Sequence, residues 1–139
     1  MWVIFEGLDK AGKGTLEWEF LKATNFKHIV IDRGPVGYAV FDVLFDRKST
    51  HNCIEFNKNI NLMRAFPDEF FVIYCKAPVD IAMQRLKEHN ETCPYDYENA
   101  QGIYDRFIDT LYRQQGIRVV TVNTEKSIET CVNFIIDSI

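Results

Sequence analysis

A glycine-rich segment that contains a lysine is the part of the sequence best suited to chemistry. It reads Gly7-Leu8-Asp9-Lys10-Ala11-Gly12-Lys13-Gly14-Thr15 and follows a short apolar run. The spacing Gly-x-x-x-x-Gly-Lys is typical of a loop that wraps a polyphosphate, because its backbone N–H groups turn inward and its lysine adds positive charge. Gly14 stands where a Ser or Thr usually binds Mg²⁺, so either Thr15 replaces it or phosphates, waters and an acid elsewhere hold the metal.

A second group of polar residues with chemical potential follows the next apolar run, where Asp32 precedes Arg33. An aspartate at the carboxyl end of a strand can hold Mg²⁺ through water, and an arginine can bind a phosphate with two parallel hydrogen bonds. Asp9 lies inside the glycine-rich loop, where a carboxylate next to phosphates is costly unless it has a function. The alternative for Asp32 and Arg33 is a surface turn with an incidental ion pair.

The elements that must position these residues can be read from the apolar pattern. Near-continuously apolar runs predict four strands, at residues 2–5, 28–31, 70–75 and 117–122. Apolar residues at helical spacing predict six helices, at residues 13–23, 36–46, 53–65, 78–89, 96–115 and 125–137. Strands that alternate with helices indicate a parallel sheet covered on both faces, with its active edge at the carboxyl ends of the strands. We expect Pro78 to lie in the first turn of its helix and Thr124 to cap the last helix.

Length and composition narrow the possible functions. The 139 residues are 47% hydrophobic, which predicts a single domain over residues 1–139 with its own core. A net charge of -4 argues against a general nucleic-acid binder. The start lacks the pattern of an export signal, and no apolar run is long enough to cross a membrane, so we expect a soluble, cytoplasmic protein. Four scattered cysteines without a metal-binding spacing are expected to be reduced thiols: Cys53, Cys75, Cys93 and Cys131.

Several blocks of the sequence resemble nucleoside monophosphate kinases. Residues 5–13 look like the opening of thymidylate kinases, above all the viral and eukaryotic ones, and residues 12–15 are similar to adenylate kinases. Asp32-Arg33 resembles the family's Asp-Arg motif, although Gly34 replaces the usual aromatic residue and Gly37 the usual serine. Residues 67–74 and 77–86 are similar to the strand and helix that lead into the family's lid, and residues 122–129 to its last strand–helix turn. These blocks cover about half of the chain.

The resemblance implies a P-loop NTPase fold, with three α/β/α layers and a four-stranded parallel sheet ordered second, first, third, fourth. It implies transfer of a phosphoryl group from ATP, with Mg²⁺, to a nucleoside monophosphate, most of all a deoxynucleotide such as thymidylate. Thr15 and Asp32 would hold the metal, and Lys13 would offset charge on the phosphates. The residues implied to bind ATP are those of the loop and of the last turn: Gly7, Asp9, Lys10, Ala11, Gly12, Lys13, Gly14, Thr15 and Thr124.

The resemblance also implies how the acceptor would be held. Asp9 would meet its sugar and Arg33 its phosphate. Arg85, on the helix that leads into the lid, would reach the transferred phosphate, although a solvated helix charge explains it equally well. Tyr38 and Phe41 could face the acceptor base, and a core position explains each of them at least as well.

The chain departs from the family pattern between Thr15 and Asp32, which are only 17 positions apart. The family has a further strand–helix unit there, which carries a phosphate-binding arginine and the residues that read thymine. The lid segment, residues 89–97, is also short and has no arginine. Base recognition must then come from the helix that starts near Pro35, from the helix at residues 52–64, or from a partner subunit in a homodimer. Such a reduced form suggests a viral or phage genome, with the host cytoplasm as its location.

Three alternatives stay open from the sequence. A deoxynucleoside kinase would use the acid before the arginine, Asp32, to take a hydroxyl proton. A P-loop protein that binds nucleotide without kinase activity is consistent with the missing unit and the thin lid. A kinase for polynucleotide 5′ ends is disfavoured by the net charge.

Overall fold

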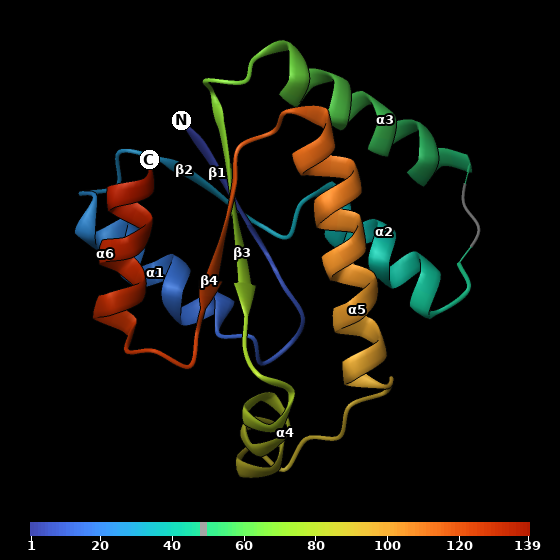
Figure 1. Cartoon of the computed structure of the whole chain (residues 1–139), viewed down its shortest axis with the longest axis vertical. Helices are drawn as coiled ribbons and strands as arrows, with labels where there is room; N and C mark the ends of the chain where they lie inside the picture. The colour runs from blue at the N-terminus through green and yellow to red at the C-terminus, as the bar shows by residue number, and fades with distance from the viewer. Residues whose placement is uncertain (48–49) are drawn as a thin grey trace.

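Four parallel strands form the sheet in the described part of the chain, and they set where the site lies (Figure 1). The structure is a computed structural model that describes residues 1–47 and 50–139, apart from the side chains of residues 50–53. The strands are β1 (Trp2–Glu6), β2 (Ile29–Asp32), β3 (Phe70–Lys76) and β4 (Val119–Asn123), in the order β2-β1-β3-β4. The predicted α/β class and the predicted strand order are therefore confirmed.

Helices cover both faces of this sheet, as the apolar strands require (Figure 1). Helices α1 (Lys13–Ala23) and α6 (Ile128–Ser138) lie on one face, and α2 (Pro35–Leu44), α3 (Thr50–Ala65) and α5 (Tyr97–Phe107) lie on the other. Successive side chains of a strand point to opposite faces of the sheet. Val3 and Phe5 therefore belong to the core on the side of α1 and α6, and Ile4 belongs to the core on the side of α2, α3 and α5. Helix α4 (Val79–Glu88) follows the carboxyl end of β3.

The register aligns the carboxyl ends of the strands at one edge. Phe5 pairs with Asp32, Glu6 pairs with Tyr74, and Lys76 pairs with Asn123. The loops that leave β1 and β2 therefore lie side by side at this edge, where ligands of open parallel sheets bind.

Two residues that the sequence prediction assigned to helix starts, Thr124 and Pro78, have other positions in the structure. Thr124 does not cap the last helix, because the Ser127 hydroxyl accepts the backbone N–H of Thr130 at 3.2 Å. The chain first turns at Asn123, whose side-chain oxygen accepts the N–H of Glu125 at 3.0 Å, and this turn delays the helix. Pro78 is the residue just before α4 rather than in its first turn.

The segment predicted as one helix over residues 96–115 has three parts. Asp96 caps α5 by accepting the N–H of Asn99 at 3.0 Å. A π-helical turn, Ile108–Tyr112, and a 3₁₀ turn, Arg113–Gln115, follow α5. Because a π turn holds more residues than an α turn, it changes the direction in which later side chains point. Tyr104 before the turn and Tyr112 within it are both fully buried.

The helix lengths and the cysteines of the described residues can be compared with the sequence analysis. None of their helices has the length and apolar character needed to cross a membrane. The thiols of Cys75, Cys93 and Cys131 are free, and Cys75 and Cys131 are buried. The side chain of Cys53 lies outside the described residues.

Candidate functional site

The glycine-rich loop connects β1 to α1 at the carboxyl edge of the sheet. Gly7 has a φ of 147°, and a side-chain carbon there would lie 2.5 Å from the carbonyl oxygen of Cys75. Gly12 has a φ of 85° and faces Thr124 at 3.2 Å. Both positions favour glycine, since other residues disfavour this backbone conformation. At Gly7 there is also no room for a side chain. The loop glycines therefore serve a tight turn, whatever the loop binds.

Lys13 and Asp32 meet at the end of this loop. The Lys13 Nζ lies 2.9 Å from Asp32 Oδ1, and the lysine side chain is 10% exposed against 62% for the aspartate. Burial alone would raise the pKa of Asp32, but the hydrogen bond and charge of Lys13 hold it below its usual value. The lysine that would meet a phosphate is thus balanced by a carboxylate from the neighbouring strand.

Glu17 is a further acid of this site that the sequence analysis did not single out. It follows Lys13 by four residues on α1, the spacing that puts two side chains on one helix face. Burial, and then the charge of Asp32, raises the pKa of Glu17 to about 7. Its Oε1 atom is buried and accepts no hydrogen bond from the described residues. The four-residue spacing from Lys13 was the signal that could have revealed it.

Arg33 occupies a strained and well-packed position beside the loop. Its φ of 65° is in the left-handed region that residues with side chains disfavour. Its Nη2 lies 3.4 Å from Asp9 Oδ1, and its guanidinium carbon lies 4.3 Å from the centre of the Phe41 ring. The Nε atom is buried and has no hydrogen-bond partner among the described residues. Among the described residues this buried donor is left unsatisfied, which adds to the cost of the position.

The two glycines after Arg33 depart from the family pattern for a packing reason. A side-chain carbon at Gly37 would lie 2.2 Å from Arg33 Cγ and 2.8 Å from Glu6 Oε2. At Gly34 it would lie 2.6 Å from Ile4 Cγ2. The helix α2 can approach Arg33 and Glu6 only because both positions lack a side chain.

Arg85 joins the loop to the turn that precedes α6. Its guanidinium donates to the backbone oxygen of Lys10 at 2.9 Å and to that of Thr124 at 2.8 Å. The Tyr97 hydroxyl adds a hydrogen bond to the backbone oxygen of Asp9 at 3.0 Å. The structure thus places Arg85 and Thr124 together against the loop, with Arg85 bound to carbonyl groups.

The remaining predicted residues lie around the same edge. Ala11 is a buried residue of the loop, and Gly14 and Thr15 are exposed in the first turn of α1. Phe41 belongs to the core and stacks on Arg33, whereas Tyr38 is an exposed ring beside it.

Glu6 is a buried acid at the end of β1 that the sequence analysis also missed. It accepts hydrogen bonds from the hydroxyls of Tyr104 and Tyr112, the latter at 2.8 Å. The Tyr104 hydroxyl in turn accepts the N–H of Gly7 at 3.0 Å, and that of Tyr112 accepts the N–H of Val36 at 3.4 Å. Burial raises the pKa of Glu6 to about 7, although both tyrosines lower it. This cluster fixes the starts of the loop and of α2 against the end of the α5 segment.

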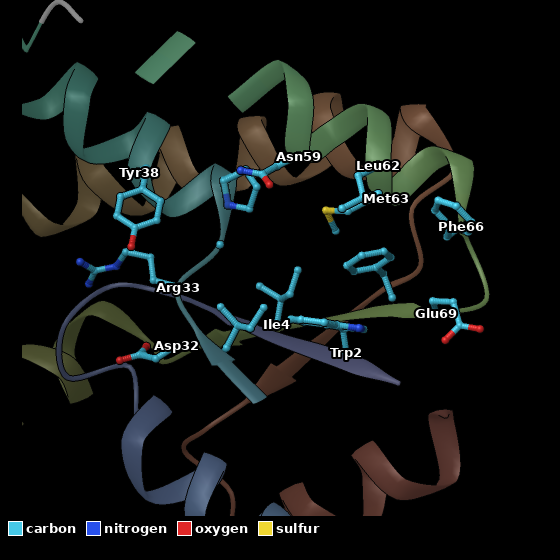
Figure 2. A pocket seen from close by; sticks show the side chains of 14 residues that line it. Trp2, Ile4, Asp32, Arg33, Tyr38, Asn59, Leu62, Met63, Phe66 and Glu69 are labelled. Carbon is cyan, nitrogen blue, oxygen red and sulfur yellow. The ribbon is translucent and has the colours of Figure 1, made fainter. Parts of the chain in front are cut away.

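An apolar pocket of about 510 Å³ opens beside Arg33 (Figure 2). Asp32, Arg33 and Tyr38 lie at one end, and Trp2 and Glu69 lie at the other. The pocket lies between the sheet and α3, on the face opposite α1.

The chain was compared with protein families, curated proteins and solved structures, and only solved structures are similar to it. No protein-family model and no curated protein matches the sequence. Among solved structures, the chain is similar to a deoxyadenosine kinase from M. mycoides with bound dATP, at a TM-score of 0.63 and 19% identity over 99% of this chain and 98% of that one. It is also similar to the YorR protein from Bacillus subtilis in complex with phosphorylated GDP, at a TM-score of 0.72 and 14% identity over 99% and 94%.

A second structure of the M. mycoides enzyme, with bound dCTP, matches at a TM-score of 0.68 and 14% identity over 99% and 97%. These similarities show that the chain has the α/β fold of P-loop kinases. The particular resemblance to thymidylate kinases stays a prediction.

Proposed function

We propose that the protein transfers the γ-phosphoryl group of ATP to a nucleoside monophosphate, with a deoxynucleotide such as thymidylate as the first candidate. One observation carries the proposal: two cations, Lys13 at the start of α1 and Arg33 just after β2, lie at the same edge of the sheet, and each forms an ion pair with a carboxylate that is more than half exposed. Phosphates are stronger partners for such cations than single carboxylates, since they offer more oxygens and more charge. The P-loop kinase fold supports the same function.

The donor would lie on the glycine-rich loop. The backbone N–H groups of residues 7–15 and the start of α1 would face its phosphates, and Lys13 would turn from Asp32 to the β and γ phosphates. Arg85 and Thr124 hold the outer side of this loop in place.

The side chains at the start of α1 and the end of β2 fit Mg²⁺. Asp32 and Glu17 supply carboxylate oxygens, one of which has no partner among the described residues, and Thr15 supplies a hydroxyl nearby in the chain. The described residues contain no group of three or more His, Cys, Asp or Glu side chains that could hold a metal ion by themselves. Mg²⁺ usually keeps several waters and phosphate oxygens as ligands. When bound, Mg²⁺ would neutralise charge on the donor phosphates.

The acceptor phosphate would lie on Arg33. Its planar guanidinium is held by the Phe41 ring, so two N–H groups can point at one phosphate without reorganisation. Asp9, which now pairs with Arg33, would be released toward the acceptor sugar. Phosphoryl transfer needs alignment and charge neutralisation rather than covalent help, and this pair of cations supplies both.

A deoxynucleoside kinase is the second candidate, because two of the similar structures belong to a deoxyadenosine kinase. In that reaction Asp32 would take the proton of the acceptor hydroxyl. Its lowered pKa and its bond to Lys13 make it a weak base, which favours the monophosphate.

The test is phosphoryl transfer from radiolabelled ATP to a panel of nucleosides and nucleoside monophosphates. A charge-assisted contact contributes about 1.5–3 kcal/mol, so Arg33→Ala should lower kcat/KM for the monophosphate by about 10- to 150-fold. Part of this loss should appear as a raised acceptor KM. Arg47→Ala is the matched control, since Arg47 also stacks on a phenylalanine, Phe45, but forms no ion pair with the loop among the described residues.

Three results would contradict the proposal. If nucleosides react and monophosphates do not, the second candidate replaces it. If ATP binds and no acceptor reacts, the protein is a nucleotide-binding protein without kinase activity. If Arg33→Ala leaves the acceptor KM unchanged on a monophosphate that the wild type uses, Arg33 does not hold the acceptor phosphate.

A further inference from the structure

The pocket beside Arg33 has the length of a nucleoside. It runs along the sheet from Asp32, at the carboxyl end of β2, to Trp2, at the amino end of β1 (Figure 2). The register pairs Phe5 with Asp32 and Trp2 with Ile29, so its ends are three residues, or about 10 Å, apart. Its volume of about 510 Å³ lies within the usual range of small-molecule sites, about 300–1,000 Å³.

The walls of the pocket suit a flat ring with a polar rim. Ile4 and Ile31, which pair across β1 and β2, line the pocket on the sheet side. Leu62 and Met63 of α3 form the opposite wall (Figure 2). The Asn59 amide, also on α3, offers an NH₂ donor group and an oxygen acceptor in a single plane. Such a mixture of apolar surface and few polar groups is typical of pockets that orient a small molecule.

Large apolar side chains at the far end are left in contact with solvent. Trp2 is 41% exposed and Phe66 is 54% exposed, although both line the same pocket. Trp2 also stacks on Phe70, with ring centres 6.2 Å apart. An aromatic end wall of this kind can hold a ring by stacking.

The end of the pocket near Arg33 indicates which chemical class of ligand would bind there. Arg33 lines that end, and its Nη2 has a long contact, 3.4 Å, with the exposed carboxylate of Asp9, which a phosphate could replace. A ligand that fills the pocket and satisfies Arg33 must therefore join an anionic group to a flat, partly polar ring. A nucleotide has this construction.

We propose that this pocket receives the nucleoside part of the acceptor, with the base between the sheet and α3, its polar edge at Asn59 and its phosphate on Arg33. The inference rests on the proposed function and specifies where that function reads the base. It assigns base recognition to α2 and α3 of the same chain, and no partner subunit is required.

The chain carries its own reporter for this site. It has two tryptophans, Trp2 in the pocket and Trp18 on α1, which packs on the other face of the sheet. Trp18→Phe would leave Trp2 as the single source of tryptophan fluorescence. We expect at least one of dTMP, dCMP, dAMP and dGMP, added without ATP, to change the Trp2 emission to a saturable limit.

Two asparagines on one helix give the matched pair of variants. Asn59→Ala should weaken the binding of that monophosphate by about 2- to 12-fold, the loss expected for one hydrogen bond. Asn61→Ala should leave binding unchanged, because Asn61 is exposed on α3 like Asn59 but does not line the pocket. ATP alone should leave the Trp2 emission nearly unchanged.

The outcomes separate this inference from the proposed function. Transfer to a monophosphate with no change in Trp2 emission, and with equal KM for the Asn59 and Asn61 variants, would overturn the pocket and leave the function standing. A saturable, Asn59-dependent response without any transfer would support the pocket and overturn the function. An emission that changes only with protein concentration would show that a second copy covers the pocket, and this too would overturn the inference.

Discussion

Replacement of Glu6 by glutamine should remove a large part of the pH dependence of stability. Burial raises the pKa of Glu6 from its ordinary 4.5 to about 7. An unfolded chain releases this proton near pH 4.5, whereas the folded protein keeps it to about pH 7. The contribution to stability is therefore complete below pH 4.5 and is lost as the pH rises to about 7. At about 1.4 kcal/mol per pKa unit, the loss amounts to about 3 kcal/mol.

Urea unfolding at pH 5 and pH 8 measures this effect. Most of the pKa window lies between these values, so the free energy of unfolding of the wild type should fall by about 2–3 kcal/mol more than that of Glu6→Gln. Glutamine keeps the shape and one oxygen acceptor for the tyrosine hydroxyls but does not titrate. Glu17, whose pKa is also raised to about 7, is present in both proteins and cancels in the difference.

A second variant, Tyr112→Phe, tests the same pKa shift in case Glu6→Gln does not fold. The hydroxyl of Tyr112 lowers the pKa of Glu6, so Tyr112→Phe should move the loss of stability to higher pH. Parallel pH profiles for the wild type and Glu6→Gln, within about 0.5 kcal/mol, would refute the reasoning: Glu6 would then be ionised in the folded protein as readily as in the unfolded chain.

The other predictions concern packing and the donor. Gly37→Ala should destabilise the protein by about 1–3 kcal/mol, because the new methyl group would overlap Arg33. Gly102→Ala should stabilise it by about 0.5–1 kcal/mol, since open space surrounds Gly102 on α5 and alanine favours a helix more than glycine does. Equal effects in urea unfolding would show that α2 can move away from Arg33. ATP with Mg²⁺ at 100 times its Kd should stabilise the wild type by about 2.7 kcal/mol, or about 9 °C for this length, and Lys13→Met should lose most of that shift. An unchanged shift in the variant would place ATP elsewhere.

The sequence predicted the fold because its signals are local. Each strand is an apolar run bounded by a loop, and the predicted strand limits differ from those observed by one or two residues. The strand order followed from the family resemblance of the glycine-rich loop and of Asp32-Arg33. The parallel-sheet rule also implied that the loops after β1 and β2 meet, and the structure brings Lys13 to Asp32 there. The roles of these residues stay predictions.

What the sequence did not reveal depends on contacts between distant residues. Glu6 meets Tyr104 and Tyr112 across about 100 residues of chain, and no spacing rule connects them. The start of the last helix depended on competition between two hydroxyls, which the turn at Asn123 decided in favour of Ser127. The pocket depends on the position of α3 against the sheet, which its apolar pattern does not fix.

The π turn at Ile108–Tyr112 limits how this chain can change in evolution. Deletion of one residue there would restore a regular α-helix and rotate everything beyond it by about 100°. Tyr112 would then point away from Glu6 and leave a buried carboxyl with one partner fewer. Homologues that keep an acid at the end of the first strand should therefore differ in this segment by substitution and keep its length, whereas loss of that acid would free the segment to shorten.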